Sequence, residues 1–287
     1  MKKMTVVFIL SLFLVSPALC ETSVWIAETD SSVLYLGGTV HFLRESDLPL
    51  PPEFEKAYNA SEILVFETDI KELSSPETMQ TIMTEGVYSD GRTLDSVLSP
   101  ETYDKLEKYC ADNSLPLASL NKFKPSMIMV MLLGVAQQKL NATQAGVDAY
   151  FLDKATTDEK AIKGLESIER QIEVLTSLGD GNEDAFVLYS IEEMDKIEEA
   201  FDSLVAAWRV GDEKALVDLF IEEVREKFPR LFRDLFADRN KDWIPVIEKF
   251  LITPETEFVL VGTGHLVGEQ GVIAQLKKLG YEVEKLK

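Results

Sequence analysis

The chain has 287 residues and a formal net charge of −21 at pH 7. A surface this acidic repels phosphate backbones and anionic lipid, so nucleic acid is excluded as an expected partner. The length is sufficient for one or two domains with a sizeable hydrophobic core.

The first twenty residues have the pattern of a secretory signal. A basic start at 1–3 is followed by an apolar run at 5–15 and a short segment that ends at Cys20. The run is too short to cross a bilayer, and no later stretch approaches the roughly 18–20 apolar residues of a spanning helix. We therefore expect an exported protein, periplasmic or secreted, that begins near Glu21 and has no stable membrane insertion.

Cys20 offers an alternative to simple cleavage, because a lipoprotein would be acylated at this position. Leu19 disfavours it, since a small residue is expected immediately before the acylated cysteine. Removal of Cys20 leaves only Cys110. An intrachain disulfide is therefore not expected, and the fold must depend on its core.

The first predicted α/β unit lies near the amino end. It consists of a strand at 32–36, a loop that contains His41, a helix at 53–58 and a nearly continuously apolar strand at 61–66 that ends at Glu67. Continuous apolarity over a short run is typical of a buried parallel strand.

A second unit of the same order lies at the carboxyl end. It consists of a strand at 256–261, a loop that contains His265, a helix at about 268–279 and a strand at 281–286. The helix is expected to end at Gly280 and to bury one apolar face, formed by Val272, Ile273, Leu276 and Leu279.

The residues between the two units show helical periodicity and few strand signals. Helices are predicted at 104–110, 127–140, 165–178, 191–208 and 213–228. The methionine-rich run at 127–133 is interpreted as a buried helix, with an adaptable binding groove as the alternative. We therefore predict a signal peptide at 1–20 and one α/β domain at 21–287. Its mostly parallel sheet is built from two strand-Gly-x-x-His-helix-strand units at about 30–70 and 255–287, with a large helical insertion at about 71–254.

The chain contains only two histidines, His41 and His265, and each follows a glycine, Gly38 or Gly262, by three residues. Both motifs, like Glu67, end a predicted parallel strand, and the carboxyl ends of parallel strands form one edge of a sheet. Two imidazoles and a carboxylate are a common ligand set for zinc, manganese, cobalt or iron. The glycines allow the backbone to turn sharply there. The alternative is that each histidine only forms hydrogen bonds within its loop.

Several segments together resemble the TraB/GumN family, in the family's order and over nearly the whole mature chain. These segments are Leu34–His41, Leu64–Glu67, Tyr150–Ala155, Lys163–Ser167, Arg239-Asn240 and Val261–Gly268. The resemblance implies an α/β core with a helical insertion, and a metal site formed by His41, His265 and Glu67, with manganese or cobalt as the metal. Together with the ligand set, which also suits zinc, this predicts a divalent metal, manganese, cobalt or zinc. The resemblance also implies peptidase activity, since the family includes metal-dependent peptidases.

The resemblance leaves the roles of individual residues open. Glu67 is expected to be either a metal ligand or the general base. Arg239 matches the family's arginine and could stabilise an oxyanion or orient a substrate carboxylate, or it could pair with a neighbouring helical acid such as Asp238 or Asp242. Asp69 and Asn240 are candidates for orienting the ligands.

The sequence therefore predicts an exported metal-dependent hydrolase, a peptidase that acts on peptides or secreted proteins through two histidines and one glutamate. A non-catalytic protein that captures a peptide, haem or metal at the same cleft is the alternative. A third interpretation is a scaffold without activity, in which both histidines are dispensable.

Overall fold

The computed structural model describes residues 22–142 and 146–287. The predicted signal segment, with Cys20, lies outside the described residues. Within them, no helix combines the length and apolar character needed to cross a membrane.

The described residues form a six-stranded sheet in the order β4-β3-β5-β2-β1-β6. Strands β4, β3, β5 and β2 are parallel, and β1 pairs antiparallel with both β2 and β6. The strands are β1 (Val24–Glu28), β2 (Val33–Thr39), β3 (Ile63–Phe66), β4 (Ala161–Gly164), β5 (Glu257–Gly262) and β6 (Glu282–Lys285). The predicted mostly parallel α/β sheet is confirmed.

The register of the central strands brings their carboxyl ends together. Thr39 at the end of β2 is opposite Gly262 at the end of β5, and Phe66 at the end of β3 is opposite Leu260. All four residues of β3 are buried, as its continuous apolar sequence predicts. The segments that follow these three strands therefore begin at one edge of the sheet.

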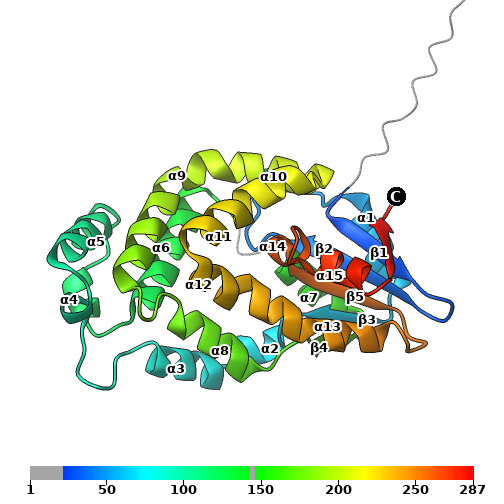
Figure 1. The fold of residues 1–287 in the computed structure, drawn as a ribbon, viewed down its shortest axis with the longest axis horizontal. Coiled ribbons are helices and arrows are strands. Elements are labelled where there is room, and N and C mark those ends of the chain that lie inside the picture. Colours follow the sequence, from blue (N-terminus) through cyan, green and yellow to red (C-terminus); the bar gives the residue numbers. More distant parts are fainter. Residues whose placement is uncertain (1–21, 143–145) are drawn as a thin grey trace, which may run out of the picture.

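Helices make up most of the remaining structure (Figure 1). The first eight are α1 (Pro52–Ala60), α2 (Ile70–Leu73), α3 (Pro76–Glu85), α4 (Leu94–Val97), α5 (Pro100–Asp112), α6 (Pro125–Lys139), α7 (Val147–Thr157) and α8 (Ile168–Ser177). The next seven are α9 (Glu183–Val210), α10 (Glu213–Val217), α11 (Glu223–Lys227), α12 (Pro229–Phe232), α13 (Asp238–Phe250), α14 (Thr263–Leu266) and α15 (Val272–Lys278). Two π-helical turns, η3 (Asp218–Glu222) and η4 (Arg233–Ala237), and two 3₁₀ turns, η1 (Glu45–Asp47) and η2 (Leu117–Leu120), complete the order.

Figure 1 shows the sheet at one end of the molecule and helices α3 to α6 at the other, joined by the long helix α9. Proline at the first turn and a serine cap begin several of these helices, including α3 and α5. The region at 71–254 is mostly helical, as predicted, but it also supplies β4, which extends the sheet beyond β3.

The second α/β unit differs from its prediction in detail. The helix expected at 268–279 is shorter than predicted and is α15, Val272–Lys278. A separate helical turn, α14, precedes it, and Gly268 between the two takes a φ of 82°. Val272, Ile273 and Leu276 are buried as expected. Leu279 is 54% exposed, because α15 ends before it and it does not continue the buried face.

The methionine-rich run lies in α6 and packs largely into the core. Met127, Ile128, Met129 and Leu132 are buried, which supports the interpretation of a core helix, whereas Val130 is 45% exposed. In the turn after α8, Gly179 and Gly181 both take positive φ.

Trp208, near the end of α9, connects the helical region to the sheet through a hydrogen bond and ring packing. Its side chain is fully buried, and its indole Nε1 donates a 2.7 Å hydrogen bond to the carbonyl oxygen of Gly38 in β2. Its ring lies 5.4 Å from that of Phe54 in α1, measured between centroids. Ser23 donates from Oγ to the Trp208 carbonyl at 2.8 Å. This one side chain therefore joins α9, α1 and β2.

We predict that Trp208→Phe lowers the free energy of unfolding by about 2–4 kcal/mol, because it removes buried volume and leaves the Gly38 carbonyl without its donor. Urea unfolding followed by circular dichroism measures this change. Leu279→Ala, at an exposed position, should change the same quantity by less than about 0.5 kcal/mol. Equal effects of the two substitutions would contradict the role given to Trp208.

Candidate active site

Glu67, His41 and His265 lie around the end of β5. The backbone N–H of Gly262 donates to Glu67 Oε1 at 2.9 Å. A Cβ atom placed on Gly262 would lie 3.3 Å from Glu67 Oε1, 3.6 Å from His265 Cδ2 and 3.8 Å from His41 Nε2. The three side chains that the sequence singled out therefore surround one point, which a glycine leaves open.

His265 is the buried histidine of the pair. It lies in α14, between the rings of Phe236 and Trp243, whose centroids are 5.1 and 4.5 Å from its own. Its Nδ1 is 2.6 Å from Asn240 Oδ1. The amide group of Asn240 donates to the Gln270 carbonyl at 2.9 Å, which turns its oxygen towards the imidazole. His265 therefore carries its proton on Nδ1, and its Nε2 is the unprotonated nitrogen, which can accept a hydrogen bond or bind a metal.

Burial lowers the pKa of His265 well below its usual value, and the nearby positive charges of Arg239 and His41 lower it further, against the opposite effect of Glu67. The imidazole is therefore neutral at physiological pH. Its Nε2 accepts a hydrogen bond from Arg239 Nη1 at 3.2 Å and lies 3.9 Å from Glu67 Oε1.

Arg239, in the first turn of α13, is 4% exposed. Its Nη2 donates to Glu67 Oε2 at 2.6 Å, to Glu166 Oε1 at 2.7 Å and to Gln171 Oε1 at 2.9 Å. Its Nε donates to Glu166 Oε2 at 3.1 Å, which makes the pair bidentate. The hydrogen-bond partners of Arg239 are therefore residues of this site, and the guanidinium orients both Glu67 and His265.

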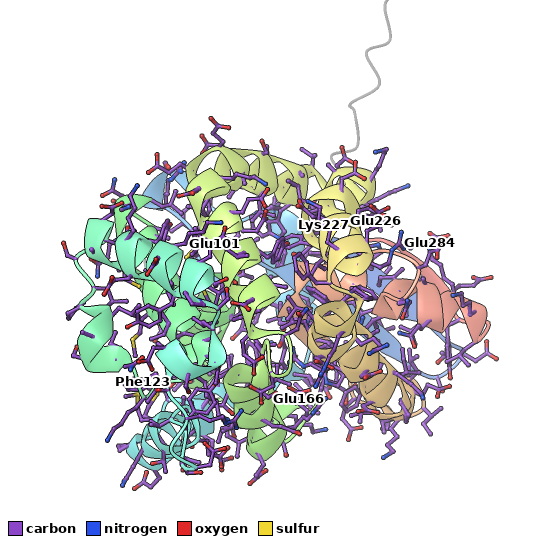
Figure 2. The ribbon with its side chains drawn as sticks, turned by 60° about the vertical axis from the view of Figure 1, so that its left-hand side comes forward. Glu101, Phe123, Glu166, Glu226, Lys227 and Glu284 are labelled. Atoms are coloured by element: carbon purple, nitrogen blue, oxygen red, sulfur yellow. The ribbon has the colours of Figure 1, made fainter. Side chains whose placement is uncertain are left out.

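Glu166 differs in its environment from the other acidic residues around it. Among the glutamates labelled in Figure 2, Glu101, Glu226 and Glu284 are exposed. The Glu166 side chain is only 8% exposed, and it also accepts a hydrogen bond from Trp243 Nε1 at 2.9 Å. A buried carboxylate with two donor side chains is a fixed counter-ion, which holds the arginine in place.

His41 is the exposed histidine, with 62% of its side-chain surface accessible. Its Nδ1 is 2.9 Å from Asp148 Oδ2 in the first turn of α7. The N–H of Val147 donates to the carbonyl of Val40 at 3.1 Å, which fixes α7 against the loop that carries His41. The negative charge of Asp148 raises the pKa of His41 from 6.5 to about 9.

Glu67 is held in its ionised form. Burial acts to raise the pKa of its carboxyl, but His265, Arg239 and His41 together lower it more strongly. Because His265 is neutral at physiological pH, Arg239 and His41 are the cations that stabilise the carboxylate. The Gly262 N–H adds a hydrogen bond to the charged form.

The donor types and their orientation fit a metal ion. Both imidazoles have a side-chain oxygen at Nδ1, from Asp148 or Asn240, and this arrangement is typical of metal-binding histidines because it leaves Nε2 as the ligand atom. Residues 22–142 and 146–287 contain no group of three or more acidic, histidine or cysteine side chains already in metal-binding geometry. Arg239 Nη1 bonds to His265 Nε2 instead, so a metal there requires this contact to shift.

The remaining predicted residues have different positions. Asn240 contacts His265, whereas Asp69 caps α2 by accepting from the N–H groups of Lys71 and Glu72. Gly38 accepts the Trp208 hydrogen bond, and a Cβ there would lie 2.8 Å from Thr263 Oγ1.

Sequence reasoning missed four residues that complete the site: Asp148, Glu166, Gln171 and Trp243. Glu166 lay within the segment that resembles the family, so it could have been singled out. Asp148 is 107 residues from His41 and carried no motif, so its role depends on the three-dimensional fold.

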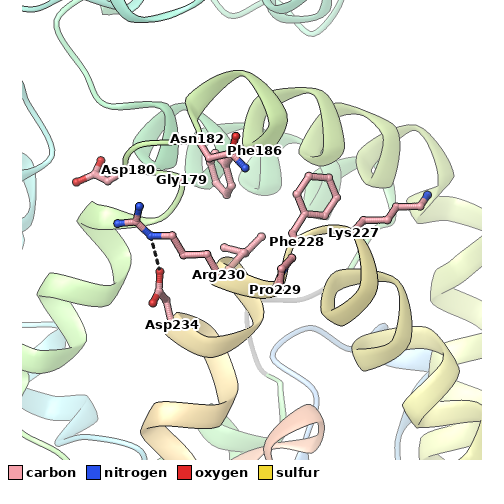
Figure 3. A pocket seen from close by; sticks show the side chains of 10 residues that line it. Gly179, Asp180, Asn182, Phe186, Lys227, Phe228, Pro229, Arg230 and Asp234 are labelled. Atoms are coloured by element: carbon pink, nitrogen blue, oxygen red, sulfur yellow. Dashed lines mark ion pairs between the residues drawn. The ribbon is translucent and has the colours of Figure 1, made fainter.

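Two pockets in the described part of the chain lie apart from this group. One is formed by the α8–α9 turn with α11, α12 and η4 (Figure 3), and the other lies between α5, α6 and α9. Neither is lined by the histidines, Glu67 or Arg239.

Comparison with known proteins places the chain in a family. The model of the TraB/PrgY/gumN family matches residues 23–285. The chain belongs to this family.

Curated relatives include a metalloprotease TIKI homolog from Nematostella vectensis, 23% identical over 88% of this chain and 64% of the relative. Metalloprotease TIKI1 from Danio rerio is 22% identical over 87% of this chain and 60% of the relative. A TIKI homolog from Amphimedon queenslandica is 22% identical over 89% of this chain and 60% of the relative. The chain thus spans less than two thirds of the length of these relatives. No solved structure matches it significantly.

The ion pair of His41 and Asp148 predicts a pH dependence in the metal-free protein. Because the folded-state pKa of His41 is about 9 and its ordinary value 6.5, the pair contributes stability that is fully present below about pH 6.5 and is lost as the pH rises through about 9. Asp148→Asn should return this pKa towards 6.5, as measured by NMR titration of the imidazole protons. The control is Asp153→Asn, at an exposed position of the same helix. An unchanged pKa in Asp148→Asn would contradict the pairing.

Proposed function

We propose that this chain is an exported metal-dependent hydrolase, a peptidase that acts on peptides or secreted proteins through His41, His265 and Glu67. The observation that carries the proposal is the matched arrangement of the two imidazoles. Each is bonded at Nδ1 to a side-chain oxygen, and both lie with the ionised Glu67 around Gly262. Membership of the TraB/PrgY/gumN family, and relatives named as metalloproteases, support the same reaction class.

The residues of the chain prepare this site in three ways. Asn240 keeps the proton of His265 on Nδ1, and burial keeps the ring neutral, so its Nε2 is available as a ligand. Asp148 orients His41 in the same sense at the exposed side of the site. Glu67 stays ionised, which suits it both as a ligand and as a base that accepts a proton from an attacking water.

A divalent cation, manganese, cobalt or zinc, would supply a Lewis acid that polarises the scissile carbonyl. Arg239 has its donors directed at Glu67, Glu166, Gln171 and His265, and it is nearly inaccessible. We therefore assign it to holding the carboxylate and the buried imidazole in place. Substrate approaches from the His41 side, because His41 is the exposed member of the group while His265 and Glu67 are 6% and 14% exposed.

Export is proposed on the basis of the basic and apolar segments at 1–15 and the short segment that ends at Cys20. A periplasmic or extracellular location matches a peptidase whose substrates are peptides or secreted proteins. Cell fractionation, with the amino-terminal sequence of the mature protein, tests this part of the proposal separately from activity.

The decisive test is the metal content and affinity of the folded mature protein, measured by elemental analysis and by calorimetry with manganese, cobalt and zinc. We expect stoichiometric binding in the wild type. His41→Ala and His265→Ala should each weaken metal binding by more than about 100-fold. Loss of a residue that only hydrogen-bonds to a metal ligand costs roughly 10–100-fold. Asp153→Asn should leave metal binding unchanged.

A peptide-library cleavage assay follows if metal binds. Cleavage that both histidine substitutions abolish supports the peptidase, whereas stoichiometric binding without cleavage favours the alternative of a binding protein. Failure of the folded wild type to bind any of the three metals would overturn the metallohydrolase.

Gly262→Ala tests the geometry of the site with a small change. The added methyl would lie 3.3 Å from Glu67 Oε1, closer than most Cβ contacts, and 3.8 Å from His41 Nε2. We predict at least about tenfold weaker metal binding and cleavage, since displacing one ligand by a fraction of an ångström disturbs the shared geometry. Gly134→Ala in α6 is the control, because a Cβ there meets nothing within 4 Å. Equal behaviour of the two variants would argue against a site around Gly262.

A further inference from the structure

The pocket in Figure 3 lies where two helical segments meet. One side is the α8–α9 turn with the first turn of α9, and the other side is the stretch from the end of α11 through α12 to the start of η4. Its volume is about 150 Å³. A cavity of about this size holds one benzene-sized group, so the pocket accommodates a single side chain and not a whole cofactor.

The lining of the pocket is suited to an apolar group. Phe186, Phe228 and Leu231 contribute apolar surface from the two sides. The charged residues at the pocket are Asp180, Lys227, Arg230 and Asp234, two of each sign. Because these charges balance, the rim gives no net attraction to a charged side chain, whereas the apolar walls favour an aliphatic or aromatic one.

Two helical segments run from this pocket to the candidate active site. On one segment, α12, η4 and α13 follow each other without a break from Leu231 in the pocket to Arg239 in the site. On the other, α8 and the turn that follows it lead from Gln171 in the site to Gly179 in the pocket. The hydrogen bond from Arg239 Nη2 to Gln171 Oε1, 2.9 Å, joins the two segments at the site end.

One of the two segments gives the distance. Arg239 is eight positions after Leu231 along an uninterrupted helical stretch, which at about 1.5 Å per residue corresponds to at most roughly 12 Å. An extended peptide rises about 3.3 Å per residue. A peptide with its reactive bond at the site therefore places a side chain at the pocket after about three to four residues.

We propose that this pocket binds one apolar side chain of the size of leucine or phenylalanine from the peptide substrate, about three to four residues from the bond that is cleaved. The assignment of substrate position rests on the proposed peptidase function, but the binding of an apolar group does not. Specificity would then come from helices of the region between the two α/β units, whereas the chemistry comes from the edge of the sheet.

The first experiment measures the pocket without catalysis. N-acetyl-phenylalaninamide is titrated into the full mature protein and followed by NMR, and we expect saturable shifts with a dissociation constant in roughly the millimolar range. N-acetyl-alaninamide should bind at least about tenfold more weakly, because it leaves the apolar walls in contact with water. Absence of saturable binding by the phenylalanine amide would overturn the proposal.

Two substitutions change the pocket in opposite directions. Leu231→Phe fills it and should weaken binding of the phenylalanine amide at least about tenfold, whereas Phe228→Ala enlarges it and should shift the preference towards N-acetyl-tryptophanamide. Leu279→Phe, at an exposed position of the chain, is the control and should bind like the wild type. Unchanged preferences in both pocket variants, with folding verified by circular dichroism, would also overturn the proposal.

The second experiment locates the pocket along the substrate. A set of alanine-based peptides carries one leucine or phenylalanine moved through successive positions, and kcat/KM is measured for each. We expect cleavage at least about tenfold faster with the apolar residue three or four positions from the bond, and Leu231→Phe should remove this preference. Cleavage that ignores the position of the apolar residue overturns the assignment. If no peptide is cleaved, the proposed peptidase function is rejected. The amide titration then tests by itself whether the pocket binds an apolar side chain.

Discussion

The buried guanidinium of Arg239 is the contact on which the site depends. It joins α13 to the segment after β3 through Glu67, to the segment after β4 through Glu166, and to α14 through His265. An arginine removed from water in this way requires fixed counter-charges, and the two carboxylates provide them. In turn, the guanidinium keeps Glu67 ionised and oriented in an otherwise desolvated position.

The two histidines are alike in sequence and different in environment. His265 is neutral and enclosed by aromatic rings, whereas His41 is exposed and its pKa is raised by Asp148. The pair therefore combines an enclosed inner position with an outer position that solvent can reach. This asymmetry follows from the fold. Trp243 of α13, Phe236 of η4 and Phe220 of η3 lie against α14, which carries His265. The loop after β2, which carries His41, contacts the first turn of α7 by a backbone hydrogen bond.

Much of this arrangement was predictable from the sequence, for a simple reason. Parallel strands end at one edge, so Glu67, His41 and His265 could be placed together from strand positions alone. Side-chain partners from the helical region were not predictable in this way. Asp148 and Gln171 lie in helices, and the strand pattern does not predict where these helices pack. The position of Glu166 is fixed in part by its hydrogen bond from Trp243. The strand β4 was missed because it has only four residues, of which three are exposed, so it lacks the apolar run of a buried strand.

The order of strands in the sheet has a consequence for how the chain folds during synthesis. Strand β5 lies between β3 and β2, which do not pair with each other, although β5 comes almost 200 residues after β3 in the chain. The middle of the sheet therefore stays open until residue 262 is present. Sequence-distant pairing of this kind is slow, because a long loop must close before its contacts form. A growing chain can thus form its helices early, but it assembles the edge with both histidines only as one of its last folding events.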